Sequence, residues 1–213
     1  MSRKKTRCCN KISGVYAITD ARVSDPVALV LQVKQAVRGG IDVLQYRGKG
    51  IPRDQALENA SLLAAICRQS DVTFIINDDV SLACEVNADG VHVGRNDGDL
   101  SHIRAALGDG ILGVSCYNDI DYALQMAAFG ADYVAFGRFF PSITKPEAIQ
   151  AELALLPRAR KLIQIPIVAI GGITPANAPP LLAAGVDSVA VVNGIFGQSD
   201  IEVASRRYAN LFV

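Results

Sequence analysis

Two stretches decide the fold: Pro166-Ile167-Val168-Ala169-Ile170-Gly171-Gly172 and Ser188-Val189-Ala190-Val191-Val192-Asn193-Gly194. Each is a short apolar run, rich in β-branched residues, that ends in a glycine-containing turn. Such runs are typical of parallel strands that are buried on both faces. Similar runs recur along the chain, and segments with helical periodicity separate them. The sequence therefore predicts a repeated strand–helix unit.

Eight such units follow one another with no linker between them. The predicted strands are Val15–Thr19, Asp42–Tyr46, Thr73–Asn77, Gly90–Gly94, Ile111–Ser115, Asp132–Gly137, Pro166–Ile170 and Ser188–Val192. The predicted helices are Asp25–Arg38, Pro52–Gln69, Val80–Asn87, Leu100–Leu107, Ile120–Phe129, Glu147–Ile163, Pro175–Ala184 and Ile201–Leu211.

This pattern predicts an α/β fold, a single (β/α)8 TIM barrel of minimal size. A doubly wound open sheet shares the alternation. Two features favour the barrel. Glycine-rich turns follow the seventh and eighth predicted strands, where barrels usually bind phosphate. No G-x-G-x-x-G follows the first strand, where an open dinucleotide-binding sheet needs one.

Composition narrows the class of protein. The chain has 213 residues, half of them apolar, and a formal net charge of zero. This suits one domain and gives no electrostatic reason to expect a nucleic-acid partner. No apolar run reaches the length of a membrane span. We interpret the basic residues 1–12 as a flexible tail and residues 13–213 as the catalytic domain.

The five cysteines form no disulfide framework, which is typical of the reducing cytoplasm. We therefore expect a cytoplasmic protein that acts on small molecules and has no nucleic-acid or membrane partner. The sequence leaves open whether it forms a homo-oligomer.

Polar residues follow most of the predicted strands, and in a barrel these strand ends meet at one mouth. Arg47 and Lys49 suit the charge of a phosphate. Asp78 and Asp97 follow adjacent strands and could share one Mg²⁺, a cation that prefers oxygen ligands. Asp79, directly before the helical run at Val80, is instead typical of a helix N-cap.

These residues predict a metal-bound diphosphate site with Gln45, Arg47, Lys49 and Lys145. A second phosphate site is predicted near Ser142 and Thr144, the Gly172 amide and the turn at Asn193. Backbone amides at a glycine turn that leads into a helix are a common anion site.

From about Val15 to about Ile195 the chain resembles the thiamine-phosphate synthase family. The motifs that carry the resemblance are Leu44-Gln45-Tyr46-Arg47-Gly48-Lys49, Ile75-Ile76-Asn77-Asp78, Ala88-Asp89-Gly90-Val91-His92-Val93-Gly94, Gly113-Val114-Ser115, Phe136-Gly137-Arg138-Phe139-Phe140-Pro141-Ser142-Ile143-Thr144-Lys145, Ala169-Ile170-Gly171-Gly172-Ile173 and Val191-Val192-Asn193-Gly194-Ile195.

The resemblance implies a transferase of thiamine diphosphate biosynthesis. Such an enzyme condenses hydroxymethylpyrimidine diphosphate with thiazole phosphate to thiamine phosphate and diphosphate. It implies that Asp78 and Asp97 bind Mg²⁺, and that Lys145, Arg47, Lys49 and Ser115 are catalytic. The implied pyrimidine-diphosphate contacts are Gln45, Tyr46, Arg47, Gly48, Lys49, Asn77, Ser115 and Lys145. The implied thiazole-phosphate contacts are Ser142, Ile143, Thr144, Gly172, Val192 and Asn193.

Five positions depart from the usual pattern of the family. Tyr46 stands where Leu is common, Gly48 where Glu is common, and Arg95 where Gln is frequent. Ser142 replaces Thr, and Asn193 replaces Ser. Arg95 either aids diphosphate binding or forms an outward salt bridge.

The remaining expectations concern single residues and alternatives. His92 is interpreted as a structural core histidine, and Cys116 is not expected to be a nucleophile. The loop Ser142–Glu147 is a candidate lid. Two other functions share this fold class: a thiazole tautomerase, and a non-catalytic sensor of thiazole or pyrimidine phosphates. The full set of metal and diphosphate residues in this sequence favours the synthase over both.

Overall fold

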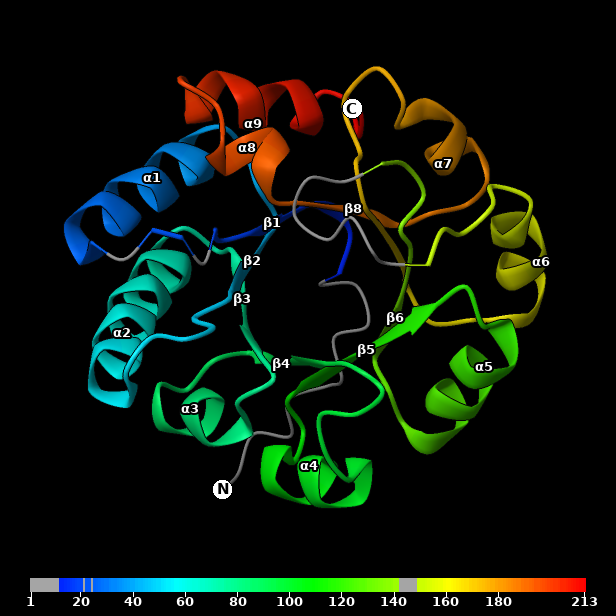
Figure 1. Ribbon diagram of the computed structural model, residues 1–213, viewed down its shortest axis with the longest axis horizontal. Coiled ribbons are helices and arrows are strands. Elements are labelled where there is room, and N and C mark those ends of the chain that lie inside the picture. Colours follow the sequence, from blue (N-terminus) through cyan, green and yellow to red (C-terminus); the bar gives the residue numbers. More distant parts are fainter. Residues whose placement is uncertain (1–11, 21, 24, 142–148) are drawn as a thin grey trace.

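The strands close into a single barrel. The computed structural model describes residues 12–20, 22–23, 25–141 and 149–213. The strands are β1 (Gly14–Ile18), β2 (Val43–Tyr46), β3 (Thr73–Asn77), β4 (Gly90–Val93), β5 (Ile111–Tyr117), β6 (Tyr133–Phe136), β7 (Ile167–Ile170) and β8 (Ser188–Val191). They pair in parallel in sequence order, and β8 pairs with β1. The predicted TIM barrel is confirmed, and the open-sheet alternative is excluded (Figure 1).

Helices surround the strands on the outside (Figure 1). They are α1 (Pro26–Arg38), α2 (Arg53–Gln69), α3 (Val80–Glu85), α4 (Leu100–Leu107), α5 (Ile120–Phe129), α6 (Leu155–Leu162), α7 (Pro179–Ala183), α8 (Asn193–Phe196) and α9 (Ile201–Ala209). Five of them begin at an aspartate whose carboxylate accepts a backbone N–H of the first turn, a stabilising N-cap. These caps are Asp25, Asp79, Asp99, Asp119 and Asp200.

The helix predicted over Glu147–Ile163 is too long. In the described part of that range, α6 begins only at Leu155. The backbone of Arg138 donates to the carbonyl of Ile149 (3.1 Å) and accepts from the N–H of Ala151 (2.8 Å), so residues 149–151 pair with the chain just after β6 and are not helical. Pro157 then falls in the first turn of α6, where a missing N–H is tolerated. A helix from Glu147 would place Pro157 in its interior.

The end of the chain also differs from prediction. The helix expected over Pro175–Ala184 begins at Pro179, because Thr174 and Asn177 close a turn with reciprocal side-chain hydrogen bonds (2.7 and 3.3 Å). The glycine turn expected after β8 is the one-turn helix α8. This short extra helix lies where TIM barrels often bind phosphate.

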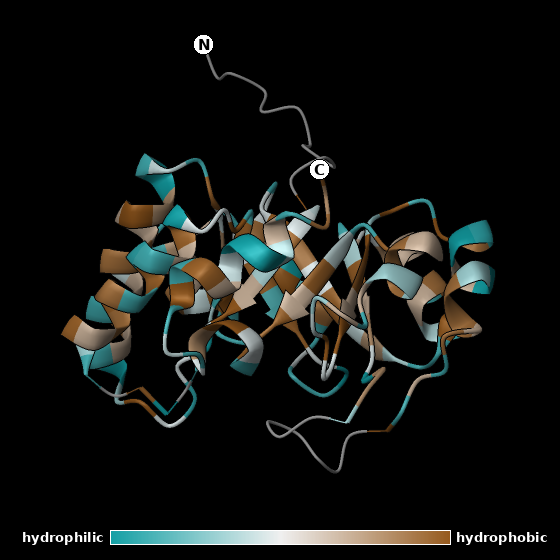
Figure 2. Ribbon diagram, turned by 90° about the horizontal axis from the view of Figure 1, so that it is seen from above, coloured by the Kyte–Doolittle hydropathy of each residue, from teal (hydrophilic) through white to brown (hydrophobic). Residues whose placement is uncertain are grey.

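Side chains of the strands alternate between the barrel interior and the layer beneath the helices. The inner cluster comprises Ile12, Tyr16, Ile18, Val43, Ile75, Tyr133, Ala135, Val168 and Ala190. Hydrophobic residues dominate the central strands, and hydrophilic residues are frequent on the outer helices (Figure 2). Polar side chains also face the interior, among them Gln45 near the mouth and Tyr16, Tyr133 and His92, which are described below.

A repeated contact ties the opposite rim together. An aspartate just before each even-numbered strand accepts a hydrogen bond from the backbone N–H at the start of the preceding odd-numbered strand. The pairs are Asp42 with Val15 (2.8 Å), Asp89 with Phe74 (2.9 Å), Asp132 with Leu112 (2.8 Å) and Asp187 with Ile167 (2.7 Å). The barrel is thus built from four similar two-strand units, which fix the strand stagger at the end away from the mouth.

The structure bears on the predicted N-terminal tail and on membrane spans. Most of the predicted tail, residues 1–11, lies outside the described residues, and Ile12 is buried in the inner cluster. Within the described ranges, no helix has the length and apolarity needed to cross a membrane.

Candidate active site

A cavity of about 400 Å³ opens at the C-terminal ends of the strands. Seven side chains or glycines singled out from the sequence line it: Gln45, Arg47, Asn77, Ser115, Gly172, Val192 and Asn193. They come from five strand ends, yet they surround one space. Apolar residues such as Ile18, Ala135, Val168 and Ala190 form its floor and walls. The arrangement suits two organic rings with charged groups held at the edge.

Other residues that line the cavity were not predicted from the sequence. Thr19 and Asp20 follow β1 and lie in the wall. Thr19 Oγ1 accepts the backbone N–H of Arg47 (2.9 Å), which fixes the start of the β2 loop. Both residues could have been predicted to line the mouth, because they stand at the end of a strand as Gln45 does. Tyr16 and Tyr133 also line the cavity, and only the inward phase of the strand alternation could have pointed to them.

Tyr46 does not face the cavity. Its ring belongs to the outer core, and its hydroxyl accepts a hydrogen bond from Asn59 of α2 (3.3 Å). The expected substrate contact through its side chain is therefore not brought to the mouth. Gly48 lies against this ring, and a Cβ at Gly48 would approach the Tyr46 hydroxyl to 2.7 Å. The two departures from the family pattern are thus coupled, because a tyrosine at 46 occupies the space beside position 48.

Asp78 and Asp97 meet beside the cavity, as expected from their adjacent strands. Partial burial and the neighbouring Asp97 carboxylate raise the pKa of Asp78, and the nearby Lys49 opposes this rise. The Gly94 N–H donates to Asp97 Oδ2 (2.7 Å) and orients it. Asp78 has φ 64°, a left-handed conformation that is uncommon outside glycine and that turns the chain sharply after β3.

The donor set fits a magnesium ion. Two like-charged carboxylates side by side are relieved by a cation, and Mg²⁺ is usually held by one or two carboxylates with water and substrate phosphates. Among the described residues, no group of three or more histidine, cysteine, aspartate or glutamate side chains forms a closed metal site. The pair therefore suits a metal that is completed by a diphosphate, and does not suit a structural zinc.

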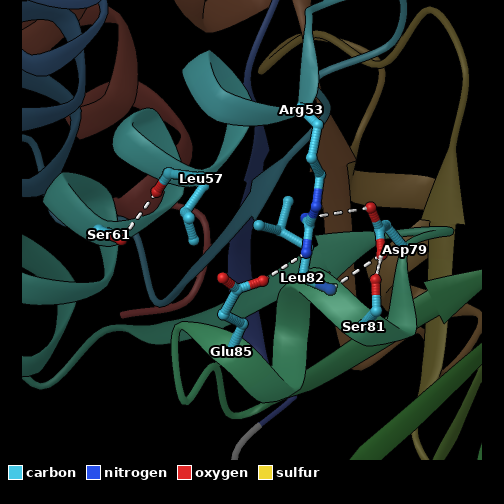
Figure 3. A network of polar contacts seen from close by, with 7 residues as sticks. All are labelled: Arg53, Leu57, Ser61, Asp79, Ser81, Leu82 and Glu85. Atoms are coloured by element: carbon cyan, nitrogen blue, oxygen red, sulfur yellow. Dashed lines mark hydrogen bonds and ion pairs between the residues drawn. The ribbon is translucent and has the colours of Figure 1, made fainter.

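Asp79 has a different task, as predicted (Figure 3). Its Oδ1 accepts the Leu82 N–H (2.8 Å) and the Ser81 hydroxyl (2.7 Å), so it is the N-cap of α3. Arg53 of α2 reaches across to Asp79 (3.5 Å) and to Glu85 (2.5 Å), at opposite ends of α3. These contacts hold the outer side of the β3 loop while Asp78 faces Asp97.

Arg95 forms the outward salt bridge. Its Nη2 donates to Asp119 Oδ2 (2.7 Å), and its guanidinium lies over the Tyr122 ring, 4.0 Å from the centroid. Asp119 is also the N-cap of α5. Arg95 therefore anchors the β4 loop to α5, and the carboxylate of Asp119 offsets its positive charge.

The opposite side of the mouth carries the backbone amides expected for the second phosphate. Gly172 has φ 62°, and a Cβ there would lie 2.2 Å from the carbonyl oxygen of Pro141. Only glycine fits between the β6 and β7 loops at this point. Asn177 Nδ2 donates to the Gly172 carbonyl (3.0 Å), and Gln198 Nε2 donates to the Asn193 carbonyl (3.0 Å). Thr174 and Gln198 also line the cavity and were not foreseen.

The surroundings of His92 and Cys116, both near Ser115, show what each side chain can do. His92 is only partly buried and lines the cavity, where its Nε2 lies 2.8 Å from Ser115 Oγ. It is therefore more than a residue of the apolar core. Cys116 faces the outer core, and burial raises the pKa of its thiol to about 12. A neutral buried thiol is a poor nucleophile, in agreement with the sequence analysis.

Ser142, Ile143, Thr144 and Lys145, together with the predicted lid Ser142–Glu147, lie outside the described residues. Their roles remain predictions from the resemblance. Of the described residues on either side, Pro141 lines the cavity, and Ile149 pairs with Arg138, which also lines it.

Comparisons with known proteins agree with this geometry. Residues 15–195 match the family model described as thiamine monophosphate synthase. The chain is 48% identical to a thiamine-phosphate synthase of Methylobacillus flagellatus over 94% of this chain and 96% of that protein. It is 47% identical to one of Nitrosococcus oceani over 95% and 94%. Among solved structures, thiamine phosphate pyrophosphorylase from Pyrococcus furiosus superposes with a TM-score of 0.87 at 32% identity, covering 95% of this chain and 96% of that one.

Proposed function

The chain belongs to the thiamine monophosphate synthase family, and from this premise we propose how its residues carry out the reaction. It is a transferase that joins hydroxymethylpyrimidine diphosphate to thiazole phosphate, giving thiamine phosphate and diphosphate in thiamine biosynthesis. In this reaction the bond between the pyrimidine methylene carbon and the diphosphate oxygen breaks. Diphosphate leaves with the electron pair, and the thiazole nitrogen forms the new bond to the methylene carbon.

The first half of the mouth binds the pyrimidine diphosphate. Gln45, Asn77 and Ser115 surround the ring, and Arg47 and Lys49 hold the diphosphate with Lys145. The support is that Gln45, Arg47, Asn77 and Ser115 line one cavity, with the paired carboxylates beside them. Arginine offers a bidentate fork and lysine a point charge to phosphate oxygens.

Asp78 and Asp97 would hold Mg²⁺ for this diphosphate. When bound, the ion supplies charge neutralisation of the leaving group. The chain itself keeps the two carboxylates together: Asp78 follows β3 in a left-handed turn, and the Gly94 amide orients Asp97.

The second half of the mouth binds thiazole phosphate. The amide of Gly172, the turn at Val192 and Asn193, and Ser142 to Thr144 are its phosphate contacts. Both glycine-bearing loops follow β7 and β8, where TIM barrels bind phosphate. Here the charge is met by backbone amides and hydroxyls, so this half needs no metal.

Apolar walls between the two halves protect the reacting carbon. Departure of diphosphate leaves a pyrimidinylmethyl cation, which water would capture. Ile18, Ala135, Val168 and Ala190 place hydrocarbon around the centre of the cavity, and the two phosphate anchors bring the thiazole nitrogen and the carbon together. No protein nucleophile is needed.

We also propose that the enzyme works in the cytoplasm on these small molecules, without nucleic-acid or membrane partners. Cys67, Cys84 and Cys116 are free thiols, in keeping with a reducing compartment.

The observation that carries the proposal is the convergence of seven expected residues on one cavity beside Asp78 and Asp97. Binding of inorganic diphosphate by calorimetry tests it. We expect tight binding only with Mg²⁺, and loss of that binding in D97N.

The matched control is D109N, an exposed aspartate before β5 at the opposite end of the barrel, which should bind like the parent protein. Magnesium-independent binding, or unchanged binding in D97N, would show that the metal and diphosphate sites are wrongly placed.

A further inference from the structure

Five polar side chains form a continuous chain of hydrogen bonds through the barrel interior. Gln45 Nε2 lies 2.8 Å from Tyr16 Oη, and Tyr16 Oη lies 2.8 Å from Tyr133 Oη. Tyr133 Oη lies 2.9 Å from His92 Nδ1, and His92 Nε2 lies 2.8 Å from Ser115 Oγ. The five residues come from β2, β1, β6, β4 and β5, and all of them line the cavity. The chain therefore links two proposed substrate contacts, Gln45 and Ser115, through residues with no assigned role.

The central phenols can carry hydrogen bonds but no charge. Tyr16 and Tyr133 are 1% and 0% exposed. Burial raises the pKa of both hydroxyls well above the ordinary value, so each remains neutral at working pH. Each thus has one proton to donate. An unsatisfied buried donor costs about 1–3 kcal/mol, so each proton is expected to point at its neighbour in the chain.

The first link sets the direction of all the others. Gln45 donates from Nε2 to Tyr16 Oη. The proton of Tyr16 then points to Tyr133, and the proton of Tyr133 points to His92 Nδ1. His92 Nδ1 must therefore carry a lone pair, and the ring proton lies on Nε2, where it is donated to Ser115 Oγ.

A protonated His92 does not fit this order. Tyr133 Oη already accepts the Tyr16 proton and directs its own proton to His92 Nδ1. A proton on Nδ1 would therefore face the Tyr133 hydroxyl proton. The neutral tautomer with hydrogen on Nε2 satisfies every link. Ser115 then accepts from His92, and its own hydroxyl proton is left for the cavity.

We infer that His92 is a positioning residue whose Nε2–H tautomer makes the Ser115 hydroxyl a hydrogen-bond donor toward the substrate. The inference rests on the proposed function, which places Ser115 at the pyrimidine. A hydroxyl donor recognises a ring nitrogen with an in-plane lone pair. With the opposite direction, Ser115 would donate to His92 and would present only lone pairs. The five-residue chain thus selects the side of the pyrimidine that can face Ser115.

Nitrogen NMR reads the tautomer directly. The sequence contains two histidines, and the side chain of His102 is 89% exposed on α4, outside the cavity. H102Q therefore leaves His92 as the only histidine and should keep parental turnover. In ¹⁵N-histidine-labelled H102Q, we expect a protonated Nε2 and an unprotonated Nδ1 at neutral pH. A protonated Nδ1, alone or together with Nε2, would overturn the inferred direction.

Steady-state kinetics test the consequence for the substrate. H92L removes the donor to Ser115, whereas the amide of H92Q can still donate to it. We expect H92L to lower kcat/KM for the pyrimidine diphosphate at least tenfold and to leave KM for thiazole phosphate nearly unchanged. H92Q should recover most of the loss. Equal changes for both substrates, or no recovery in H92Q, would indicate a structural role only.

Y133F provides an independent variant of nearly the same size. It breaks the chain between Tyr16 and His92, and it should lower kcat/KM for the pyrimidine diphosphate in the same selective way. Parental kinetics in Y133F would overturn the inference. Turnover by the parent enzyme separates the proposed function from the positioning role of His92. If the parent makes thiamine phosphate and these variants have the same kinetics as the parent, the positioning role fails and the function stands. If the parent makes none, the function fails, and the NMR result still decides the tautomer.

Discussion

Replacement of Asp132 tests the physical basis of the barrel rim. Asp132 Oδ2 accepts the backbone N–H of Leu112 (2.8 Å) and the guanidinium of Arg104 (2.7 Å). Leu112 is fully buried. D132A leaves its N–H without this acceptor at a cost of about 1–3 kcal/mol. The lost ion pair adds about 1 kcal/mol, since both side chains are partly solvated.

We therefore expect D132A to lower the free energy of unfolding by about 2–4 kcal/mol. For a chain of this length this lowers Tm by about 5–15 °C. D132N keeps a carbonyl oxygen as acceptor and loses only the charge, so it should cost about 1 kcal/mol. Arg104 remains bonded to the carbonyl of Gly130 (2.6 Å) in both variants.

Urea and thermal unfolding followed by circular dichroism measure these differences. D109A, at an exposed position of the same end of the barrel, serves as the control and should match the parent. Two results would refute the reasoning. D132A within 0.5 kcal/mol of the parent would show that the backbone acceptor is unimportant, and equal losses in D132A and D132N would show that the charge alone matters.

Four further predictions concern the mouth and the surface. D78N should lower kcat about 100-fold by removing a metal ligand, whereas D79A, which removes the N-cap of α3 and the contact with Arg53, should lower Tm and keep kcat; product formation at saturating Mg²⁺ compares them, and equal kcat would contradict the assignment. K145A, outside the described residues, should likewise lose most of its turnover. G172A forces a Cβ to within 2.2 Å of the Pro141 carbonyl oxygen, so kcat/KM for thiazole phosphate should fall about 10–100-fold, and an unchanged value would argue against a phosphate contact there. Glu202 has a lowered pKa because two arginines hold its carboxylate. Its folded-state pKa lies below the unfolded one, so its stabilisation is present at neutral pH and is lost on acidification. The Tm difference between the parent and E202Q should shrink below pH 4.5, the ordinary value; a difference that persists there would contradict the ion-pair account.

The order of strands could be predicted from the sequence because parallel strands buried on both faces leave continuous apolar runs. The convergence of Gln45 and Ser115 on one cavity also follows, since strand ends of a barrel meet at one mouth. Helix lengths were less predictable. The start of α6 depends on backbone pairing with Arg138, which no local pattern reveals.

The five-residue chain of hydrogen bonds through the barrel could not be predicted in the same way. Tyr16 and Tyr133 lie in apolar strand runs, and their pairing across 117 positions depends on the closure of the barrel. His92 was interpreted as structural because periodicity shows burial but not hydrogen-bond partners. The aspartates of the rim could have been predicted from the sequence, since Asp42 and Asp132 each stand directly before a strand.

Formation of thiamine phosphate tests the central claim most directly. The purified parent protein is incubated with hydroxymethylpyrimidine diphosphate, thiazole phosphate and Mg²⁺, and the products are separated and quantified. We predict one thiamine phosphate for each diphosphate released, with no thiamine phosphate when either substrate or the metal is omitted. Binding of both substrates without any thiamine phosphate would contradict it.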